Sequence, residues 1–225
     1  MAIARIDLMG SPNIGVYALT SNTLTMLPVH LSRKKTQHFI DVLQGEPVYT
    51  TLSGTTLLGI FAAANSHGII LPQYVTDDEV ANIKKNWNEK GNIARIPGKY
   101  TALGNLLLVN DYGALASRYL ADEPRILREI QEVLDVEVVP GDIAGLPYVG
   151  SIATATNKGV LAHPLLRDQE RDLIEEILKV PVDVGTVNGG VPFIASGLLA
   201  NDFGVLIGPP TTGPEIVIIS NLFEP

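Results

Sequence analysis

The side chains that most often carry out chemistry are few in this chain and widely spaced. It contains no cysteine, which excludes disulfides, thiolate zinc sites and cysteine nucleophiles together. Its four histidines show neither His-x-x-x-His spacing nor an accompanying cluster of carboxylates, the arrangements that hold metal ions. We therefore expect no metal site at any of them, namely His30, His38, His67 and His163.

Two further kinds of reactive site lack their usual surroundings. Ser53, Ser151 and Ser196 do not lie in the Gly-x-Ser-x-Gly turn that exposes a serine nucleophile. The glycine-rich stretches 141–145 and 185–190 are not followed by the Lys-Ser/Thr pair with which a phosphate loop holds nucleotide and Mg²⁺. The sequence thus predicts no catalytic residue and no cofactor, and it predicts turns at both glycine-rich stretches.

Length and composition indicate a folded protein with an acidic balance of charge. The chain has 225 residues, of which 46% are hydrophobic and 18% are charged, a composition too apolar for a disordered protein. Its formal net charge of −8 disfavours a phosphate backbone as the main partner and favours a basic partner. The basic cluster Arg33-Lys34-Lys35 would make at most a local contact with RNA.

Hydropathy gives no sign of a membrane segment. The sequence has no apolar run of the roughly 18 residues that a membrane span needs, and residues 1–5 lack the layout of a signal peptide. We expect a cytoplasmic protein that has no membrane partner.

One local pattern recurs along the chain. Residues 102–115 contain an apolar run, an Asn-Asp-x-Gly turn and a second apolar run, which is typical of a β-hairpin because Asn and Gly accept positive φ. Aligned on the asparagine of the turn, the pattern recurs at intervals of 43, 45, 47 and 44 residues. The aligned residues are Asn22, Asn65, Asn110, Asn157 and Asn201. A period of roughly 20–50 residues indicates a propeller or a solenoid.

Each repeat predicts two strands, a helix and a third strand. Helical spacing is clear at 168–178, and residues 76–79 have the Thr and Glu of a capping box. In the last repeat, the Gly and Pro residues of 208–214 leave no room for a full helix, so 216–219 is expected to be a strand. We expect one domain, 1–225, with a closing strand in 1–9 and repeats at about 10–53, 54–98, 99–145, 146–190 and 191–225.

Units of this kind must pack around a common axis. A single β-β-α-β unit cannot bury its helix and both faces of its sheet alone, so five copies favour a closed ring. The first strands are expected to begin at glycines such as Gly15 and Gly59. Small residues in these strands fit the crowded neighbourhood of an axis, and they include Ala62, Ala64, Ala153 and Ala155.

Several short strings resemble the translation initiation factor 6 family in its shorter, archaeal-type form. The resemblance spans the whole chain and rests on the identity and order of strings at 102–105, 110–112, 149–151, 157–159, 163–164, 180–181 and 185–188. It implies a pentein fold, which is an α/β propeller of five pseudo-symmetric β-β-α-β blades around a central axis. The number of repeats agrees with this fold.

The resemblance also implies a function without catalysis. It implies a monomer that binds the large (50S) ribosomal subunit and sterically prevents its association with the small subunit, in translation initiation and ribosome biogenesis. The main contact of the family is ribosomal protein uL14, near the sarcin–ricin loop. Because ribosomal proteins are typically basic, an acidic factor is complementary to them in charge.

The contact surface that the resemblance implies lies at one end of the ring. The loops before the first strands emerge together there, and by position they match the stretches through which the family engages the large subunit. The family carries Arg at the positions of Ile60 and Gly189, so this chain lacks a charged contact at both. Asn105 has two interpretations, since its amide could close a turn or contact the ribosome. The expected ribosome-binding residues are Gly15, Leu58, Gly59, Ile60, Gly104, Asn105, Leu106, Gly150, Ser151, Asn188 and Phe193.

Two other functions are compatible with such a ring. Penteins also include hydrolases and transferases that act on guanidino groups through a Cys thiolate. The absence of cysteine disfavours this alternative, because a serine hydroxyl needs an adjacent base to react at neutral pH. A ring-shaped clamp or scaffold with no ribosomal role is the second alternative, and it would not cosediment with large subunits.

Overall fold

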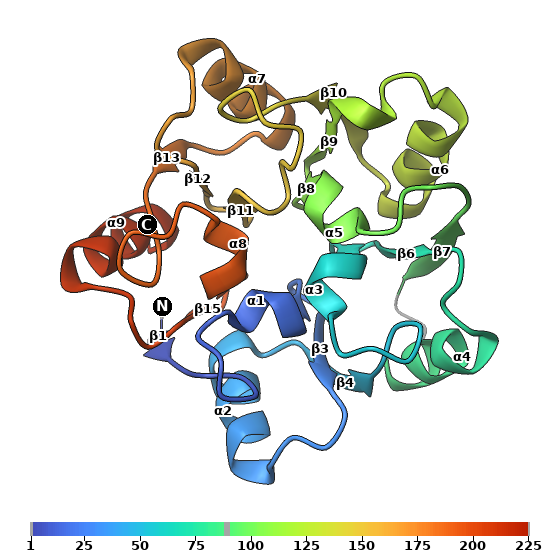
Figure 1. Cartoon of the computed structure of the whole chain (residues 1–225), viewed down its shortest axis with the longest axis horizontal. Helices are drawn as coiled ribbons and strands as arrows, with labels where there is room; N and C mark the ends of the chain where they lie inside the picture. The colour runs from blue at the N-terminus through green and yellow to red at the C-terminus, as the bar shows by residue number, and fades with distance from the viewer. Residues whose placement is uncertain (1, 88–90, 225) are drawn as a thin grey trace.

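The computed structural model describes residues 2–87 and 91–224 of the chain. Within these residues the strands form five three-stranded sheets, which are arranged as blades around a central axis (Figure 1). The predicted five-bladed α/β ring is confirmed. Residues 88–90 of the expected second repeat, Met1 of the expected closing segment and Pro225 of the expected fifth repeat lie outside the described residues.

Each of the first three blades begins with one turn of helix, followed by a hairpin, a longer helix and a third strand. Blade one contains α1 (Ile14–Tyr17), β2 (Leu19–Thr20), β3 (Leu24–Pro28), α2 (Arg33–Leu43) and β4 (Glu46–Thr50). Blade two contains α3 (Leu58–Phe61), β5 (Ala63–Ala64), β6 (Gly68–Pro72), α4 (Asp77–Asn86) and β7 (Asn92–Ile96). Blade three contains α5 (Leu103–Leu106), β8 (Leu107–Val109), β9 (Gly113–Ser117), the 3₁₀ helix η1 (Arg118–Leu120), α6 (Pro124–Leu134) and β10 (Glu137–Gly141).

The last two blades vary this order. Blade four has a turn at 149–152 in place of the first helix, and it contains β11 (Ala153–Ala155), β12 (Val160–Ala162), α7 (Asp168–Leu178) and β13 (Val182–Val184). Blade five contains α8 (Ile194–Gly197), β14 (Leu198–Ala200), β15 (Gly204–Ile207), α9 (Gly213–Phe223) and, from the start of the chain, β1 (Ala2–Arg5).

Among the described helices, none combines the length and the apolar composition needed to cross a membrane.

The strands of every blade pair in the same way. The first strand is antiparallel to the middle strand and the third is parallel to it, so that in blade three Leu115 pairs with both Leu108 and Val139. The longer helix makes the crossover that a parallel pair requires. In blade five, β1 takes the place of the third strand and pairs in parallel with β15, which joins the start of the chain to its last sheet.

The last repeat contains a full helix where the sequence predicts a strand. Helix α9 runs through residues 216–219, so the predicted strand there is wrong. Pro214 lies in the first turn of α9, where a backbone N–H would have no acceptor within the helix, so a proline is tolerated there. Thr212 and Glu215 form a capping box at the same end. The packing of the helix against the ring then overrides the strand propensity of its β-branched residues, and it buries Ile219, Leu222 and Phe223.

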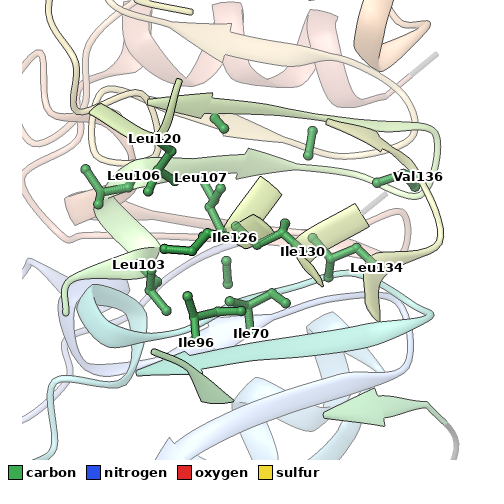
Figure 2. Packing of buried hydrophobic residues seen from close by; sticks show 13 residues of the cluster. Ile70, Ile96, Leu103, Leu106, Leu107, Leu120, Ile126, Ile130, Leu134 and Val136 are labelled. Atoms are coloured by element: carbon green, nitrogen blue, oxygen red, sulfur yellow. The ribbon is translucent and has the colours of Figure 1, made fainter. Parts of the chain in front are cut away.

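The core lies between neighbouring blades. In Figure 2, Ile126, Ile130 and Leu134 of α6 lie with Ile70 and Ile96 of blade two in one buried cluster. Helix α6 contacts both β6 and β7 of that blade. Because each helix is covered partly by the blade before it, the stability of a blade depends on its neighbours.

Buried asparagines link three pairs of neighbouring blades at the hairpin turns. The Nδ2 group of Asn110 donates to the carbonyl oxygens of Thr156 (3.1 Å) and Leu178 (2.8 Å) in the next blade. Its Oδ1 accepts from the N–H groups of Tyr112 and Gly113 in its own turn. The same pattern of bonds is made by Asn65 and Asn201.

The turns of blades one and four have a hydroxyl in place of this amide. Ser21 and Thr156 occupy the equivalent position, and each accepts a hydrogen bond from its own turn through the side-chain oxygen. The alignment on Asn22 and Asn157 is therefore wrong by one residue, and the structural intervals are 44, 45, 46 and 45 residues. A hydroxyl has a single proton, so it cannot reproduce the two donations of the amide.

Replacing Asn110 with Thr, the residue that blade four has at this position, should remove both bonds to the next blade and leave two buried carbonyls unsatisfied. We expect the free energy of unfolding, measured by urea denaturation, to fall by about 2–3 kcal/mol. The same substitution at the exposed Asn221 is the control and should change it by less than about 0.5 kcal/mol. Equal effects at the two positions would contradict the linking role.

Glu215 ties the first turn of α9 to the loop before α8. Its carboxylate accepts from the N–H groups of Gly189 (3.1 Å), Gly190 (2.8 Å) and Thr212 (2.6 Å) and from the hydroxyl of Thr186 (2.7 Å). Burial alone would raise the pKa of this carboxyl group, but the hydrogen bonds outweigh burial and lower the pKa to about 2. The ionised form of Glu215 therefore stabilises the contact between the first turn of α9 and residues 189–190.

Replacing Glu215 with Gln should destabilise the protein most at neutral pH. Because the folded-state pKa lies below the ordinary value of 4.5, the stability due to ionisation is present above pH 4.5 and is lost as the pH falls towards 2. We expect the difference in unfolding free energy between wild type and variant to narrow by about 2 kcal/mol between pH 7 and pH 3 in urea titrations. A difference that stays constant with pH would refute this role of the carboxylate.

Candidate functional site

One end of the central axis is formed by the short helices α1, α3, α5 and α8 and by the turn before β11 (Figure 1). The sequence predicts strands that begin at the glycines of these segments, whereas the structure has a helical turn before the short strands of four blades. The glycines allow neighbouring backbones to touch, because a Cβ on Gly59 would lie 1.9 Å from the carbonyl oxygen of Gly15. Likewise, a Cβ on Gly104 would lie 2.0 Å from the carbonyl oxygen of Gly59. The short helices therefore form a closely packed inner ring.

A depression of about 460 Å³, here named the central depression, lies where the short helices meet. Its described lining contains apolar, amide and hydroxyl side chains and no charged residue. The expected ribosome-binding residues that line it are Gly15, Gly59, Ile60, Asn105, Gly150, Ser151 and Phe193. The lining residues that sequence reasoning missed are Asn13, Val16, Val191, Ala195 and Ser196.

The other four expected residues do not line the central depression. Leu58, Gly104 and Leu106 are buried in the inner ring. Asn188 lies in the loop before α8 with a φ of 52°, and its Nδ2 group donates to the carbonyl oxygen of Pro12. These four residues support the backbone of this end of the ring.

Asn105 combines a fixed backbone with an available side chain. Its N–H donates to the carbonyl oxygen of Ala102 (3.0 Å), and its own carbonyl oxygen accepts from the N–H of Gly150 (3.1 Å) in the next blade. The side-chain amide of Asn105 is half-buried, and it forms no hydrogen bond with any other described residue. The backbone of Asn105 therefore holds the turn, and its side-chain amide is not needed for these bonds.

A second depression, of about 370 Å³, adjoins the first and shares Asn105 with it. Tyr119 and Tyr148 cross edge to face there with ring centroids 6.2 Å apart, and the hydroxyl of Tyr100 donates to the carbonyl oxygen of Tyr119 (2.6 Å). The ammonium group of Lys99 lies 5.1 Å from the centre of the Tyr100 ring. We name this depression the tyrosine cleft, and its lining is Lys99, Tyr100, Thr101, Ala102, Asn105, Leu106, Tyr119 and Tyr148.

Sequence reasoning missed the tyrosine cleft. Its three tyrosines are far apart in the chain and outside the apolar periodicity of the strands and helices. Tyr119 and Tyr148 are each 46% exposed, which is unusual for large rings that serve only the core. Interaction with the hydroxyl group of Tyr119 raises the pKa of Tyr148 above its ordinary value.

The opposite end of the axis is closed by a ring of hydrogen-bonded polar side chains. Asn157 donates through Nδ2 to Asp111 (2.7 Å) and Asp202 (2.9 Å), and Asn22 donates to Asp202 (2.6 Å). The N–H of Ser66 donates to Asp111 (2.7 Å). These carboxylates link blades, and in the described residues no group of three His, Asp or Glu side chains is arranged to hold a metal ion.

A narrow channel of about 100 Å³ lies along the axis between the two ends. Residues with small or aliphatic side chains make up most of its wall, and the described lining has no charged side chain that could bind a substrate. The small residues that the sequence places near the axis all line it, namely Ala62, Ala64, Ala153 and Ala155.

The ring is similar to that of a known enzyme. A solved structure of dimethylarginine dimethylaminohydrolase, in an adduct with S-methyl-L-thiocitrulline, superposes with a TM-score of 0.50. It shares 14% sequence identity, and the match covers 76% of this chain and 68% of that one. At this identity the similarity concerns the fold, and it agrees with a pentein ring.

Sequence comparison gives closer relatives. The translation initiation factor 6 of Methanocaldococcus jannaschii is 40% identical over 223 residues, which cover 97% of this chain and 96% of the relative. That of Pyrococcus horikoshii is 41% identical over 222 residues, with 97% of both chains covered. That of Pyrobaculum aerophilum is 37% identical over 215 residues, with 96% of both covered.

The family model described as eIF-6 family matches residues 3–222, which is almost the whole chain. The relatives are named as initiation factors and not as enzymes, although a protein with the same fold is an enzyme. A role in translation initiation follows, and this chain belongs to the eIF-6 family.

Proposed function

We propose that this chain binds the large ribosomal subunit, as a monomer in the cytoplasm, and sterically prevents the small subunit from joining. The binding surface is the end of the ring that carries the central depression. The observation that supports this most directly is that seven of the residues expected to contact the subunit surround this one depression.

Such a function needs shape and adhesion, with no bond made or broken. The touching glycine backbones of the inner ring hold the contact residues in place before binding. Preorganised residues lose little conformational entropy when a complex forms, which favours affinity. A rigid ring bound at the joining surface then excludes the small subunit by its volume.

The central depression has the composition of an interface centre. The residues described in its lining carry no charged side chain, and they include Phe193, which is 50% exposed. Aromatic side chains are enriched at the centre of protein interfaces, and charged residues are depleted there. With Ile60 in place of an arginine, packing and amide hydrogen bonds make the central contacts.

The charge of the whole chain supports a basic partner. A formal charge of −8 is complementary to ribosomal proteins, which are typically basic, and uL14 near the sarcin–ricin loop is the partner we propose. Complementary charge chiefly accelerates the encounter, while the uncharged centre determines how long the complex lasts.

Sedimentation tests the proposed function directly. Protein mixed with isolated large subunits should sediment with them, and small subunits added afterwards with Mg²⁺ should form fewer joined ribosomes than in its absence. The proposal fails if the protein remains at the top of the gradient or if joining proceeds unchanged.

Replacing Asn105 with Ala should weaken binding to the large subunit about thirtyfold, or about 2 kcal/mol, because it removes an unbonded amide at the centre of the contact. Thermal stability should be unchanged, since the backbone of Asn105 makes the bonds of the turn. The control is Asn221→Ala on the exposed side of α9, which should bind as wild type does. Wild-type affinity of the Asn105 variant would remove this residue from the contact surface.

A further inference from the structure

Blade three departs from the pattern of the ring at the loop before its short helix. In the other four blades the corresponding loop is a tight turn closed by a backbone bridge. In blades two, four and five, a glutamate in the first turn of the long helix accepts the N–H groups of that loop, namely Glu79, Glu170 and Glu215. Helix α6 of blade three has neither an acidic residue in its first turn nor a side-chain cap.

Other contacts hold the loop of blade three. Gln73 of blade two donates to the carbonyl oxygen of Gly98 and accepts from its N–H, both at 3.3 Å. Further along, the hydroxyl of Tyr100 is bonded to the carbonyl oxygen of Tyr119. Four blades fold with the common turn, so folding alone does not require this departure, and a local departure of this kind points to function. The tyrosine cleft lies at this loop.

We propose that the tyrosine cleft receives an apolar side chain from an extended segment of a ribosomal protein, and that a carboxylate beside that side chain pairs with Lys99. This inference rests on the proposed function. It adds the chemical class of the group that is bound next to Asn105.

The size and walls of the cleft fit such a side chain. A volume of about 370 Å³ accommodates one or two side chains, and the walls are aromatic rings and the aliphatic groups of Ala102 and Leu106. Tyrosines offer a large contact area at a low cost in conformational entropy, which is why they are frequent at binding hot spots. The edge-to-face packing of Tyr119 and Tyr148 holds the walls in place.

Charge distinguishes between the classes of partner. Lys99 is the only charged residue of the described lining, and the nearby Arg118 is paired with Asp142 at 2.5 Å. A single lysine would neutralise few of the phosphates that an RNA strand brings, and the net charge of −8 opposes RNA. Lys99 would also repel a cationic side chain. A neutral apolar group can pack against the aromatic and aliphatic walls, and a carboxylate beside it can pair with Lys99.

Site-specific photocrosslinking on isolated large subunits identifies what enters the cleft. Tyr148, Phe193 and Tyr112 are replaced, one at a time, by the photoreactive residue p-benzoylphenylalanine, which preserves the aromatic bulk. Phe193 reports on the central depression, and Tyr112 is an equally exposed aromatic residue in the hairpin turn of blade three, at the opposite end of the axis. After irradiation, mass spectrometry identifies protein crosslinks and primer extension identifies rRNA crosslinks.

We expect position 148 to attach to a ribosomal protein at an apolar residue with Asp, Glu or a chain-terminal carboxylate beside it, and position 112 to attach to nothing. Attachment of position 148 to rRNA overturns the inference. So does the absence of attachment at 148 while position 193 attaches, an outcome that leaves the proposed function standing. If neither position attaches and the protein does not sediment with subunits, the proposed function fails and the inference fails with it.

Charge reversal at Lys99 tests the carboxylate. We expect Lys99→Glu to weaken binding to large subunits about tenfold and Lys99→Gln to weaken it less, since the first adds repulsion and the second only removes attraction. Lys158→Glu, in the turn at the opposite end of the ring, is the matched control and should not change the affinity. Unchanged or tighter binding by the Lys99→Glu variant would show that no carboxylate approaches this lysine.

Discussion

The ring depends on hydrogen bonds that buried side-chain amides make from one blade to the next. One asparagine accepts from the N–H groups of its own hairpin and donates to two carbonyls of the neighbouring blade, so it closes a turn and joins two blades at once. A buried carbonyl left without such a partner costs about 1–3 kcal/mol, and the polar end of the axis is therefore built around these bonds. At the other end, glycines let the backbones of the short helices touch. Both ends resist deformation, so the proposed binding surface is already formed in the unbound protein.

Much of the fold could be predicted from the sequence, because repetition is a property of spacing. The turn pattern predicts the ring, and the apolar spacing predicts the helix at 168–178. Thr76 and Glu79 predict a capping box. All three predictions are confirmed. Two local predictions are wrong for physical reasons. Residues 216–219 are β-branched and apolar, and such a short run fits a buried helix as well as a strand. In blades one and four an asparagine lies one residue after the position that accepts from the turn, which Ser21 and Thr156 occupy, so an alignment on asparagine is displaced by one residue there.

The candidate site was harder to predict, because it depends on which side of a short helix faces outward. Gly59 and Ile60 line the central depression, while the adjacent Leu58 is buried, and one turn of helix is too short to show a period. The tyrosine cleft unites residues of α5 and the loop before it, of η1 and of the loop before β11, which only the ring brings together. The fold itself says little about function here, since a dimethylarginine dimethylaminohydrolase has a similar ring. What distinguishes this chain from that enzyme is its family, whose members are named as initiation factors.

The pairing of β1 with β15 has a consequence for biosynthesis. Residues 2–5 are made about 200 residues before their partners, residues 204–207. A nascent chain must keep its first strand unpaired while four blades are assembled, and the fifth sheet is completed only after residue 207 has left the exit tunnel. During translation the ring is therefore an open arc, and it can close only after residues 204–207 have been made.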